Sequence, residues 1–277
     1  MTTEQEFNRA AQLISRADSL IIAAGAGMGV DSGLPDFRGK AGFWRHYPAL
    51  QKAGLDFQSM AAPAHFWSSP RLAWGFYGHR LALYRKTQPH AGFRILQDIA
   101  NRLPHHAFVY TSNVDGQFQK AGFAADQIYE CHGSIHHLQC IDACRRHIWS
   151  AQGFDPVVDE TACQLMNDFP VCPVCGLAAR PNILMFGDMG WVSRRADDQR
   201  EKLHAWLDKV ARPVVLELGA GLVVATVRSF AERQYSPLIR INLRDARVRS
   251  PMHVSLPMGA LAALEGIRDA LAKRSFF

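Results

Sequence analysis

A glycine-rich loop near the start of the chain has the composition of a nucleotide-binding loop. Residues 20–39 read Leu-Ile-Ile-Ala-Ala-Gly-Ala-Gly-Met-Gly-Val-Asp-Ser-Gly-Leu-Pro-Asp-Phe-Arg-Gly. Because glycine has no Cβ, the backbone N–H groups at Gly25 and Gly27 can approach a pyrophosphate closely. The spacing G-x-G-x-G-x-x-x-G departs from the G-x-G-x-x-G of common dinucleotide folds, and no clear ribose-binding acid follows. A tight strand-to-helix turn without a ligand is the alternative, but the Pro-Asp-Phe-Arg run at its end favours a nucleotide.

Polar residues suited to acid–base chemistry follow two further expected strands. Asn113 and Asp115 come soon after one apolar run, and His132 follows the next run. Ligands of parallel sheets bind at the carboxyl ends of the strands, so these side chains can converge on the glycine loop. A histidine there can act as a general base near neutral pH. Any one of them alone would more often be a cap, a turn residue or a packed histidine.

The cysteine spacing predicts a metal site. The six cysteines stand at positions 131, 140, 144, 163, 172 and 175. Cys140-x-x-x-Cys144 and Cys172-Pro-Val-Cys175 form two pairs with twenty-seven residues between them, a spacing typical of a four-thiolate zinc site. Four thiolates leave no open position on the metal, so we expect one structural zinc. Disulfides are the alternative, which a reducing compartment disfavours, and Cys163 is the main rival ligand.

These residues need a parallel sheet to position them. Five mostly continuous apolar runs are expected strands: 20–24, 107–110, 128–130, 213–218 and 238–242. Helices are expected at 3–17, with Thr2 or Thr3 as the cap, at 63–85 and at 92–102. Continuously apolar strands between helices indicate a parallel sheet covered on both faces. The predicted fold class is therefore α/β, with a Rossmann-type sheet.

Two segments interrupt this α/β pattern. Residues 136–182 are rich in cysteine and short of regular periodicity, so we interpret them as an inserted zinc-binding module. Residues 40–87 are aromatic and helical, and we assign them to a helical insert of the same small lobe. The large nucleotide-binding domain is then expected to comprise residues 1–39, 88–135 and 183–277.

The composition excludes several classes of protein. The 277 residues carry 31 Lys and Arg against 25 Asp and Glu, a net charge of +6, and the basic residues are scattered. We therefore expect no direct nucleic-acid binding, which requires a basic stripe interleaved with aromatic residues. The chain starts with acidic and polar residues and has no run of eighteen apolar ones, so we expect a cytoplasmic protein without a membrane partner.

Together, these motifs make the chain resemble a sirtuin, the family of NAD-dependent protein lysine deacylases. The family's G-A-G-x-S-x-x-S-G-I-P-D-F-R appears as Gly25-Ala-Gly-Met-Gly-Val-Asp-Ser-Gly-Leu-Pro-Asp-Phe-Arg38. Its T-Q-N-I-D-x-L-H-x-x-A-G appears as Thr111-Ser-Asn-Val-Asp-Gly-Gln-Phe-Gln-Lys-Ala-Gly122. The remaining motifs follow in order as His132-Gly133, the paired cysteines, Phe186-Gly-Asp188, Gly219-Ala-Gly-Leu222 and Ile241-Asn242. The match, of bacterial type, covers nearly the whole chain.

The resemblance implies a large Rossmann-type domain and a smaller lobe, with NAD and an acyl-lysine protein or peptide meeting between them. In the family mechanism the acyl oxygen attacks the nicotinamide ribose and nicotinamide leaves. A histidine then deprotonates a ribose hydroxyl, which attacks the resulting intermediate, so that free lysine and an acyl-ADP-ribose are the products. Carried over, His132 is the base, while Asn113 and Asp115 organise the ribose and nicotinamide. The implied cofactor-binding positions are Gly25, Ala26, Gly27, Asp36, Phe37, Arg38, Ser112, Asn113, Asp115, Gly219, Gly221 and Asn242, and the peptide would pair as an added strand with Phe186 and Gly187.

A further motif concerns the acyl group. Phe76-Tyr77-Gly-His-Arg80 is similar to the F-Y-x-x-R of sirtuins that remove succinyl, malonyl or glutaryl groups. Tyr77 and Arg80 are three residues apart, so on a helix they share a face and could grip one terminal carboxylate. The alternative is that Tyr77 belongs to the core and Arg80 to the solvated surface.

Four departures from the family motifs each remove a hydrogen-bonding group or shorten its reach, so we expect altered cofactor affinity or rate. They are Gly29 and Gly221 in place of serine, Ser112 in place of glutamine and Phe118 in place of histidine. Because His132, Asn113 and Asp115 are retained, deacylation is the first hypothesis. The alternatives are transfer of ADP-ribose to protein, NAD hydrolysis, and a non-catalytic NAD-sensing or peptide-binding module.

Overall fold

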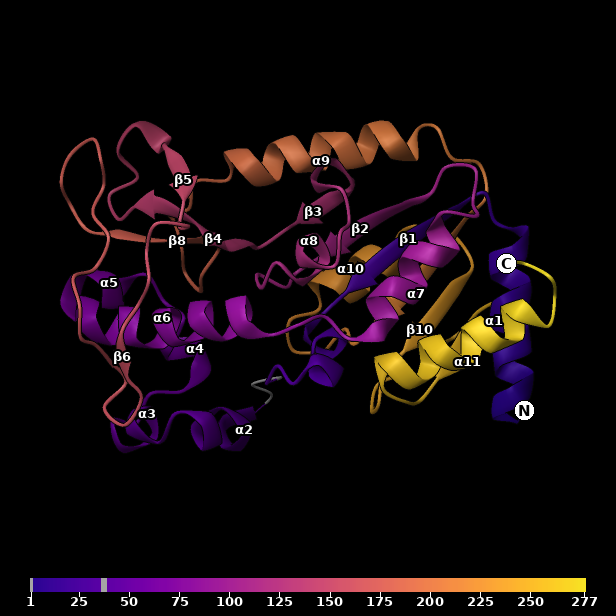
Figure 1. The fold of residues 1–277 in the computed structure, drawn as a ribbon, viewed down its shortest axis with the longest axis horizontal. Coiled ribbons are helices and arrows are strands. Elements are labelled where there is room, and N and C mark those ends of the chain that lie inside the picture. The colour runs from indigo at the N-terminus through magenta and orange to yellow at the C-terminus, as the bar shows by residue number, and fades with distance from the viewer. Residues whose placement is uncertain (1, 36–38) are drawn as a thin grey trace.

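The computed structural model describes residues 2–35 and 39–277, and its elements form two groups (Figure 1). The first surrounds a large sheet and contains α1 (Thr3–Arg16), β1 (Ser19–Ala24), the 3-10 helices η1 (Ala26–Met28) and η2 (Val30–Ser32), α7 (Ala91–Ala100), β2 (Ala107–Thr111), α8 (Gln117–Lys120), η3 (Ala125–Gln127), β3 (Ile128–Glu130), α9 (Arg194–Leu207), β9 (Pro213–Leu218), α10 (Thr226–Glu232), β10 (Leu238–Ile241), β11 (Val254–Leu256) and α11 (Ala260–Ala272). The second contains α2 (Gly39–His46), α3 (Pro48–Lys52), α4 (Phe57–Met60), α5 (Ala64–Ser68), α6 (Pro70–Lys86), β4 (Gly133–Cys140), η4 (Cys144–Arg146), β5 (Ile148–Ser150), β6 (Val158–Asp159), β7 (Gln164–Leu165) and β8 (Ala179–Ile183). Among the described helices, none is long and apolar enough to cross a membrane.

The large sheet has the strand order β11-β10-β9-β1-β2-β3, and every neighbouring pair is parallel. From β1 the chain adds β2 and β3 on one side of the sheet, and later adds β9, β10 and β11 on the other side. This is the Rossmann topology. The order reverses between β1 and β9. Ligands of such sheets bind at this reversal, outside the carboxyl ends of the strands.

Strand β1 shows why the strands of this sheet are continuously apolar: both of its faces are covered. Leu20, Ile22 and Ala24 belong to the core that contains residues of α1, α7 and α11. Ile21 and Ala23 point to the opposite face, where residues of α9 and α10 cover the sheet. All six residues of β1 are buried. The predicted parallel sheet with both faces covered is confirmed.

The predicted elements are found with small differences. Thr2 caps α1, and its side chain and that of Gln5 form a reciprocal capping box. The single helix predicted at 63–85 is wrong, because the chain breaks at Ser69, which is extended (φ −148°). Ser69 precedes Pro70, whose ring disfavours a helical conformation in the residue before it. Strand β11 was not predicted, since its three residues alternate with Ser255 at the centre.

The second group of elements shares one hydrophobic core, although its helices and strands come from separate parts of the sequence. Phe66, Trp74 and Tyr77 of the helices pack in the same cluster as Leu138 and Cys172 of the cysteine-rich segment. The indole Nε1 of Trp74 donates to the carbonyl oxygen of Ala179 at 2.9 Å, which joins α6 to β8. Both insertions therefore pack as one lobe, on the left of Figure 1.

The two loops at the reversal of the sheet lie backbone against backbone. The N–H of Gly25 donates to Leu218 at 2.9 Å, and the N–H of Gly27 donates to Gly219 at 3.1 Å. A Cβ added at Gly219, whose φ is +60°, would lie 2.3 Å from the Cα of Gly27. Such a contact is far inside van der Waals distance. Glycine at positions 25 and 219 is therefore required by the loop–loop contact itself, before any ligand is considered.

We expect Gly219→Ala to destabilise the protein by about 1–3 kcal/mol. The added methyl must push the two loops apart, and the alanine must adopt the positive φ of this position. Gly153→Ala is the matched control, since a Cβ added at Gly153 meets nothing within 4 Å. Thermal unfolding of the two variants checks this. Equal melting temperatures for both variants would show that the loops can separate without penalty.

Candidate active site and metal centre

The glycine loops present backbone donors at the reversal of the sheet. Gly25, Ala26 and Gly27 follow β1, while Gly219 and Gly221 follow β9. Within the part of the chain that the structure describes, the N–H groups of Ala26 and Gly221 donate to no protein acceptor. Unpaired N–H groups on adjacent glycine loops are the donors that a pyrophosphate requires. The loop geometry therefore fits the dinucleotide expected from the sequence.

The segment after β2 is hydrogen-bonded to the first glycine loop. The Nδ2 of Asn113 donates to the carbonyl oxygen of Gly25 at 3.1 Å. The hydroxyl of Thr111 donates to Ala24 at 2.9 Å and accepts the N–H of Asn113 at 3.0 Å. The N–H of Ser112 also donates to Ala24, at 3.3 Å. These bonds place Asn113 beside the first glycine loop.

Asp115 occupies an environment that favours its protonated form. Burial raises its pKa to about 6, although the N–H of Gln117, which donates to Oδ1 at 2.9 Å, opposes this. The charge of Glu130 raises the pKa further, and the charge of Arg80 lowers it. Arg80 belongs to α6 of the small lobe. A carboxyl group with this pKa can exchange a proton near neutral pH.

His132 lies where the two lobes join. Its carbonyl oxygen accepts the N–H of Leu184 at 2.9 Å, and the next residue, Gly133, begins β4 of the small lobe. Gly133 has a φ of +77°, and a Cβ there would lie 2.1 Å from the carbonyl oxygen of Asn182. Burial lowers the pKa of His132 below its ordinary value, so the imidazole is neutral at neutral pH. A neutral, partly buried imidazole is the form that a general base requires.

Arg80 is buried in a cage of aromatic rings. Its Nε and Nη2 donate to the hydroxyl of Tyr84 at 3.0 and 2.8 Å. Its guanidinium carbon also lies 5.3 Å from the ring centre of Phe76, 5.7 Å from that of Tyr77 and 5.9 Å from that of Phe57. Only 8% of Arg80 and 1% of Tyr77 are exposed, so the surface reading of Arg80 is wrong and Tyr77 is buried. Burial also raises the pKa of Tyr77 to about 12, which keeps its hydroxyl a donor.

The loop that contains Phe186 and Gly187 reaches the same region. The N–H of Phe186 donates to the carbonyl oxygen of Ala61 at 2.9 Å. The ring of Phe186 meets that of Phe57 edge-on, with centroids 6.3 Å apart, and Phe57 also contacts Arg80. Phe186 is 38% exposed and Gly187 is exposed with a φ of +66°. The four substrate positions expected from the sequence thus lie around one aromatic cluster.

Asn242 lies beneath the second glycine loop. Its Nδ2 donates to the carbonyl oxygen of Ala220 at 2.8 Å, and its Oδ1 accepts the N–H groups of Arg244 and Asp245, both at 3.1 Å. Only 2% of Asn242 is exposed. Asn242 therefore supports the loop in this structure. Three further expected cofactor residues, Asp36, Phe37 and Arg38, lie outside the described residues.

Sequence reasoning missed two buried ion pairs that shape the site. Asp188, 0% exposed in its side chain, accepts from Arg180 at 2.8 Å through each oxygen, and also accepts the N–H groups of Met185 and Gly190. This pair folds the loop that carries Phe186. Glu130, two residues before His132, is paired with Arg195 of α9. Both pairs join segments that are apart in the sequence, and the sequence around a charged residue does not show which residue will pair with it.

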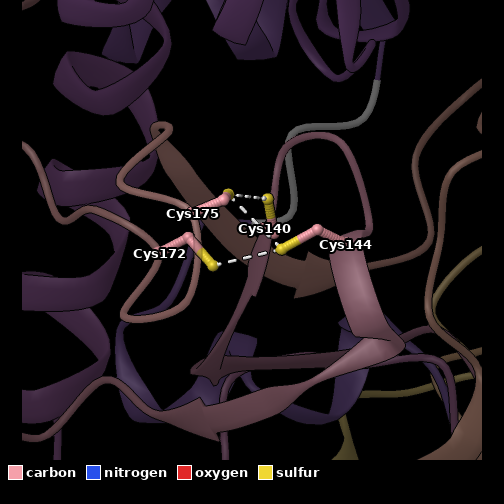
Figure 2. A group of neighbouring side chains, drawn as sticks. All are labelled: Cys140, Cys144, Cys172 and Cys175. Carbon is pink, nitrogen blue, oxygen red and sulfur yellow. Dashed lines mark hydrogen bonds between the residues drawn. The ribbon is translucent and has the colours of Figure 1, made fainter.

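The four cysteines predicted to bind zinc form one cluster (Figure 2). Their sulfur atoms all lie within 4.8 Å of one another, with Cys140 3.5 Å from Cys175 and Cys144 3.3 Å from Cys175. Cys140 ends β4 and Cys144 begins η4, whereas Cys172 and Cys175 come from a turn before β8. Cys163 is not in the cluster, since it lies between β6 and β7 and its carbonyl approaches Gly75 of α6.

The sulfur geometry fits a tetrahedral zinc ion. Zinc–thiolate bonds of about 2.3 Å in a tetrahedron separate the sulfur atoms by roughly 3.8 Å, close to the spacing observed. All four positions on the metal would be filled by protein, so the ion would be structural. It would hold η4 and the turn before β8 together, where the segment has few buried side chains of its own.

We expect Cys172→Ser to lose the bound zinc and Cys163→Ala to retain it. The first change removes one thiolate from the cluster, while the second removes a buried thiol outside it. Elemental analysis of the purified variants, compared with the unmodified chain, measures the zinc per molecule. Loss of zinc from Cys163→Ala with retention in Cys172→Ser would reassign the fourth ligand.

We expect Asp115→Asn to be more stable than the unmodified chain at pH 7.5. The folded pKa of Asp115 is about 6 against an ordinary 3.8, so this group's favourable contribution is lost as the pH rises through 6. Asparagine has no charge to bury, and the gain is about 3 kcal/mol at most. Thermal melts should show the difference narrowing from pH 7.5 to pH 5, with the exposed Asp126→Asn as the control. A variant less stable than the unmodified chain at pH 7.5 would contradict this reading of the site.

Comparison with known proteins places this site in a family. The model of the Sir2 family matches residues 25–224. A protein of Thermococcus kodakarensis named NAD-dependent protein deacylase is 28% identical over 98% of this chain and 99% of its own length. One of Thermus thermophilus with the same name is 25% identical over 94% of this chain and 93% of its own.

Solved structures agree in fold. A crystal structure of a Sir2 homologue with NAD superimposes with a TM-score of 0.71 at 22% identity, over 96% of this chain and 94% of that one. A Sir2 homologue with ADP-ribose also gives 0.71, at 21% identity, over 99% and 98%. The family model spans both glycine loops, the segment after β2, His132 and the cysteine cluster. The chain belongs to the Sir2 family.

Proposed function

We propose that this protein is an NAD-dependent protein lysine deacylase, which releases nicotinamide and an O-acyl-ADP-ribose. The relatives that match it over almost their whole length carry that name. The observation that carries the proposal is the arrangement at the carboxyl edge of the sheet. There Asn113 donates to the first glycine loop, and His132 lies at the junction with β4 of the small lobe.

His132 is the proposed general base. It takes the proton from a ribose hydroxyl, whose oxygen then attacks the carbon of the transferred acyl group. Because burial lowers its pKa, the imidazole is ready to accept a proton throughout the neutral range. Asn113 and Asp115 would orient the ribose and nicotinamide. The N–H groups of Ala26 and Gly221 would bind the pyrophosphate.

An acyl-lysine segment of a protein is the proposed partner. It would lie along the loop of Phe186 and Gly187, where Gly187 is exposed and an extended peptide could pair as an added strand. Residues 1–39, 88–135 and 183–277 would bind NAD, and the inserts 40–87 and 136–182 would form the opposite wall. The proposed compartment is the cytoplasm, where the thiols of the six cysteines, all free in this structure, would remain reduced.

We further propose that the preferred acyl group ends in a carboxylate, as succinyl and malonyl groups do. Arg80 is buried beside Tyr77, and its guanidinium donates to the phenol of Tyr84 and lies over the rings of Phe76 and Tyr77. A buried guanidinium is stabilised strongly by a carboxylate, through charge-assisted hydrogen bonds. The Tyr77 hydroxyl, kept protonated by burial, is a second donor for that carboxylate.

The test of the main proposal is mass spectrometry of acetyl-, succinyl-, malonyl- and long-chain acyl-lysine peptides incubated with NAD. We expect one or more of these peptides to lose its acyl group in step with nicotinamide release. His132→Asn should reduce the rate by about 100-fold or more, since the general base is absent. Nicotinamide release without loss of any acyl group, or ADP-ribosylated protein, would support the transferase or hydrolase reading instead.

We expect Arg80→Met to lower kcat/KM for a succinyl peptide by about 100-fold and to change that for an acetyl peptide much less. The substitution removes the charge but keeps a long apolar side chain in the aromatic cage. Steady-state rates on the two peptides give the ratio. Equal losses of kcat/KM on both peptides would show that Arg80 stabilises the small lobe and does not recognise the acyl group.

A further inference from the structure

The loop Gly219-Ala-Gly221 has no side chain that can donate a hydrogen bond. Any hydrogen bond from this loop to a phosphate must therefore come from its backbone N–H groups. A single backbone N–H contributes to binding only if its direction is fixed in advance, because an unrestrained glycine loop can rotate the peptide away. The structure contains a device that fixes one peptide of this loop.

Two buried side chains donate to the same carbonyl oxygen, that of Ala220. Arg228 donates through Nη2 at 3.1 Å, and Asn242 donates through Nδ2 at 2.8 Å. The Nη2 of Arg228 also donates to the carbonyl oxygen of Asp245 at 2.8 Å, and the N–H of Asp245 donates to Asn242. The four residues thus close a ring of hydrogen bonds, which joins the loop after β9 to the loop after β10.

The ring determines the direction of the next N–H. No peptide bond among the described residues is cis, so the C=O of Ala220 and the N–H of Gly221 point in opposite directions. The C=O points toward Arg228 and Asn242, which are 8% and 2% exposed. The N–H of Gly221 therefore points away from this buried pair, and it donates to no acceptor in the described part of the protein.

Stability alone does not explain Arg228. It lies in the first turn of α10, where the helix dipole disfavours a cation, and its buried Nε has no hydrogen-bond partner among the described residues. Its nearest carboxylate, Glu217, is 3.6 Å away and is already held by both arms of Arg240 at 2.8 Å. The short hydrogen bonds of Arg228 thus go to two loop carbonyl oxygens, those of Ala220 and Asp245, which indicates a role in fixing these loops.

We propose that Arg228 is a positioning residue for NAD: with Asn242 it holds the Ala220 carbonyl inward, and so directs the Gly221 N–H toward the pyrophosphate. This inference rests on the proposed use of NAD. The role is geometric, since Arg228 and Arg240 are balanced locally by Glu217 and Glu232. Lysine would keep the charge, but it has a single nitrogen and cannot reproduce the planar guanidinium.

The test is calorimetric titration of the whole protein with ADP-ribose, which requires no acyl substrate and no turnover. We expect Arg228→Gln to weaken binding by about tenfold, and Arg228→Lys to weaken it by a smaller factor. Arg233→Gln is the matched control, because Arg233 is exposed at the end of the same helix and donates to Ser229 of that helix. It should bind ADP-ribose as the unmodified chain does.

Kinetics then separate positioning from general support. Arg228→Gln should raise KM for NAD while KM for the acyl peptide and the melting temperature stay close to those of Arg233→Gln. Equal ADP-ribose affinity in Arg228→Gln and the unmodified chain would overturn this inference but leave the proposed function standing. Equal rises in the KM for NAD and the KM for the acyl peptide would do the same. Failure of both Arg228 variants to fold would also overturn it, by assigning Arg228 to stability. An unmodified chain that binds no ADP-ribose would overturn the proposed function itself.

Discussion

The close approach of two backbone loops at the reversal of the sheet is the constraint on which the site depends. Gly25 and Gly27 contact Gly219 so closely that a single Cβ would not fit between them. With the loops in contact, the N–H groups of Ala26 and Gly221 in the two loops would be available to one ligand, and Asn113 reaches the carbonyl oxygen of Gly25. The catalytic edge is thus assembled from the sheet outward, and the departures at Gly29 and Gly221 alter its donors without altering its frame.

The site also concentrates groups that are costly to bury. Asp115, Glu130, Arg80 and Arg228 all lie at the carboxyl edge or in the small lobe against it, and each is partly or fully removed from water. Buried charges and carboxyl groups with raised pKa values reduce the stability of the folded state. Proteins retain such groups where binding or catalysis requires them. The extensive apolar core on both faces of the sheet supplies the stability that offsets this burden.

Local patterns predicted most of this structure, and long-range pairing accounts for the rest. Strand β1 is visible as an apolar run, and the paired cysteines are visible from their spacing, because both signals lie within a few residues. The break at Ser69 was missed because the helical pattern continues on both sides of Pro70. Arg228 and Arg180 were missed because their importance depends on burial and on partners that only the fold brings near.

The shared core of the small lobe has a consequence for how acyl preference can change between relatives. Tyr77 and Trp74 come from one insertion, yet they pack with Leu138 and Cys172 from another that follows much later in the sequence. Neither insertion presents a complete apolar surface without the other. Recombination or grafting that carries only the helical segment into another member of the family would leave mismatched halves. The proposed acyl pocket is therefore inherited as a pair of segments, and changes in its wall are coupled to changes around the cysteine cluster.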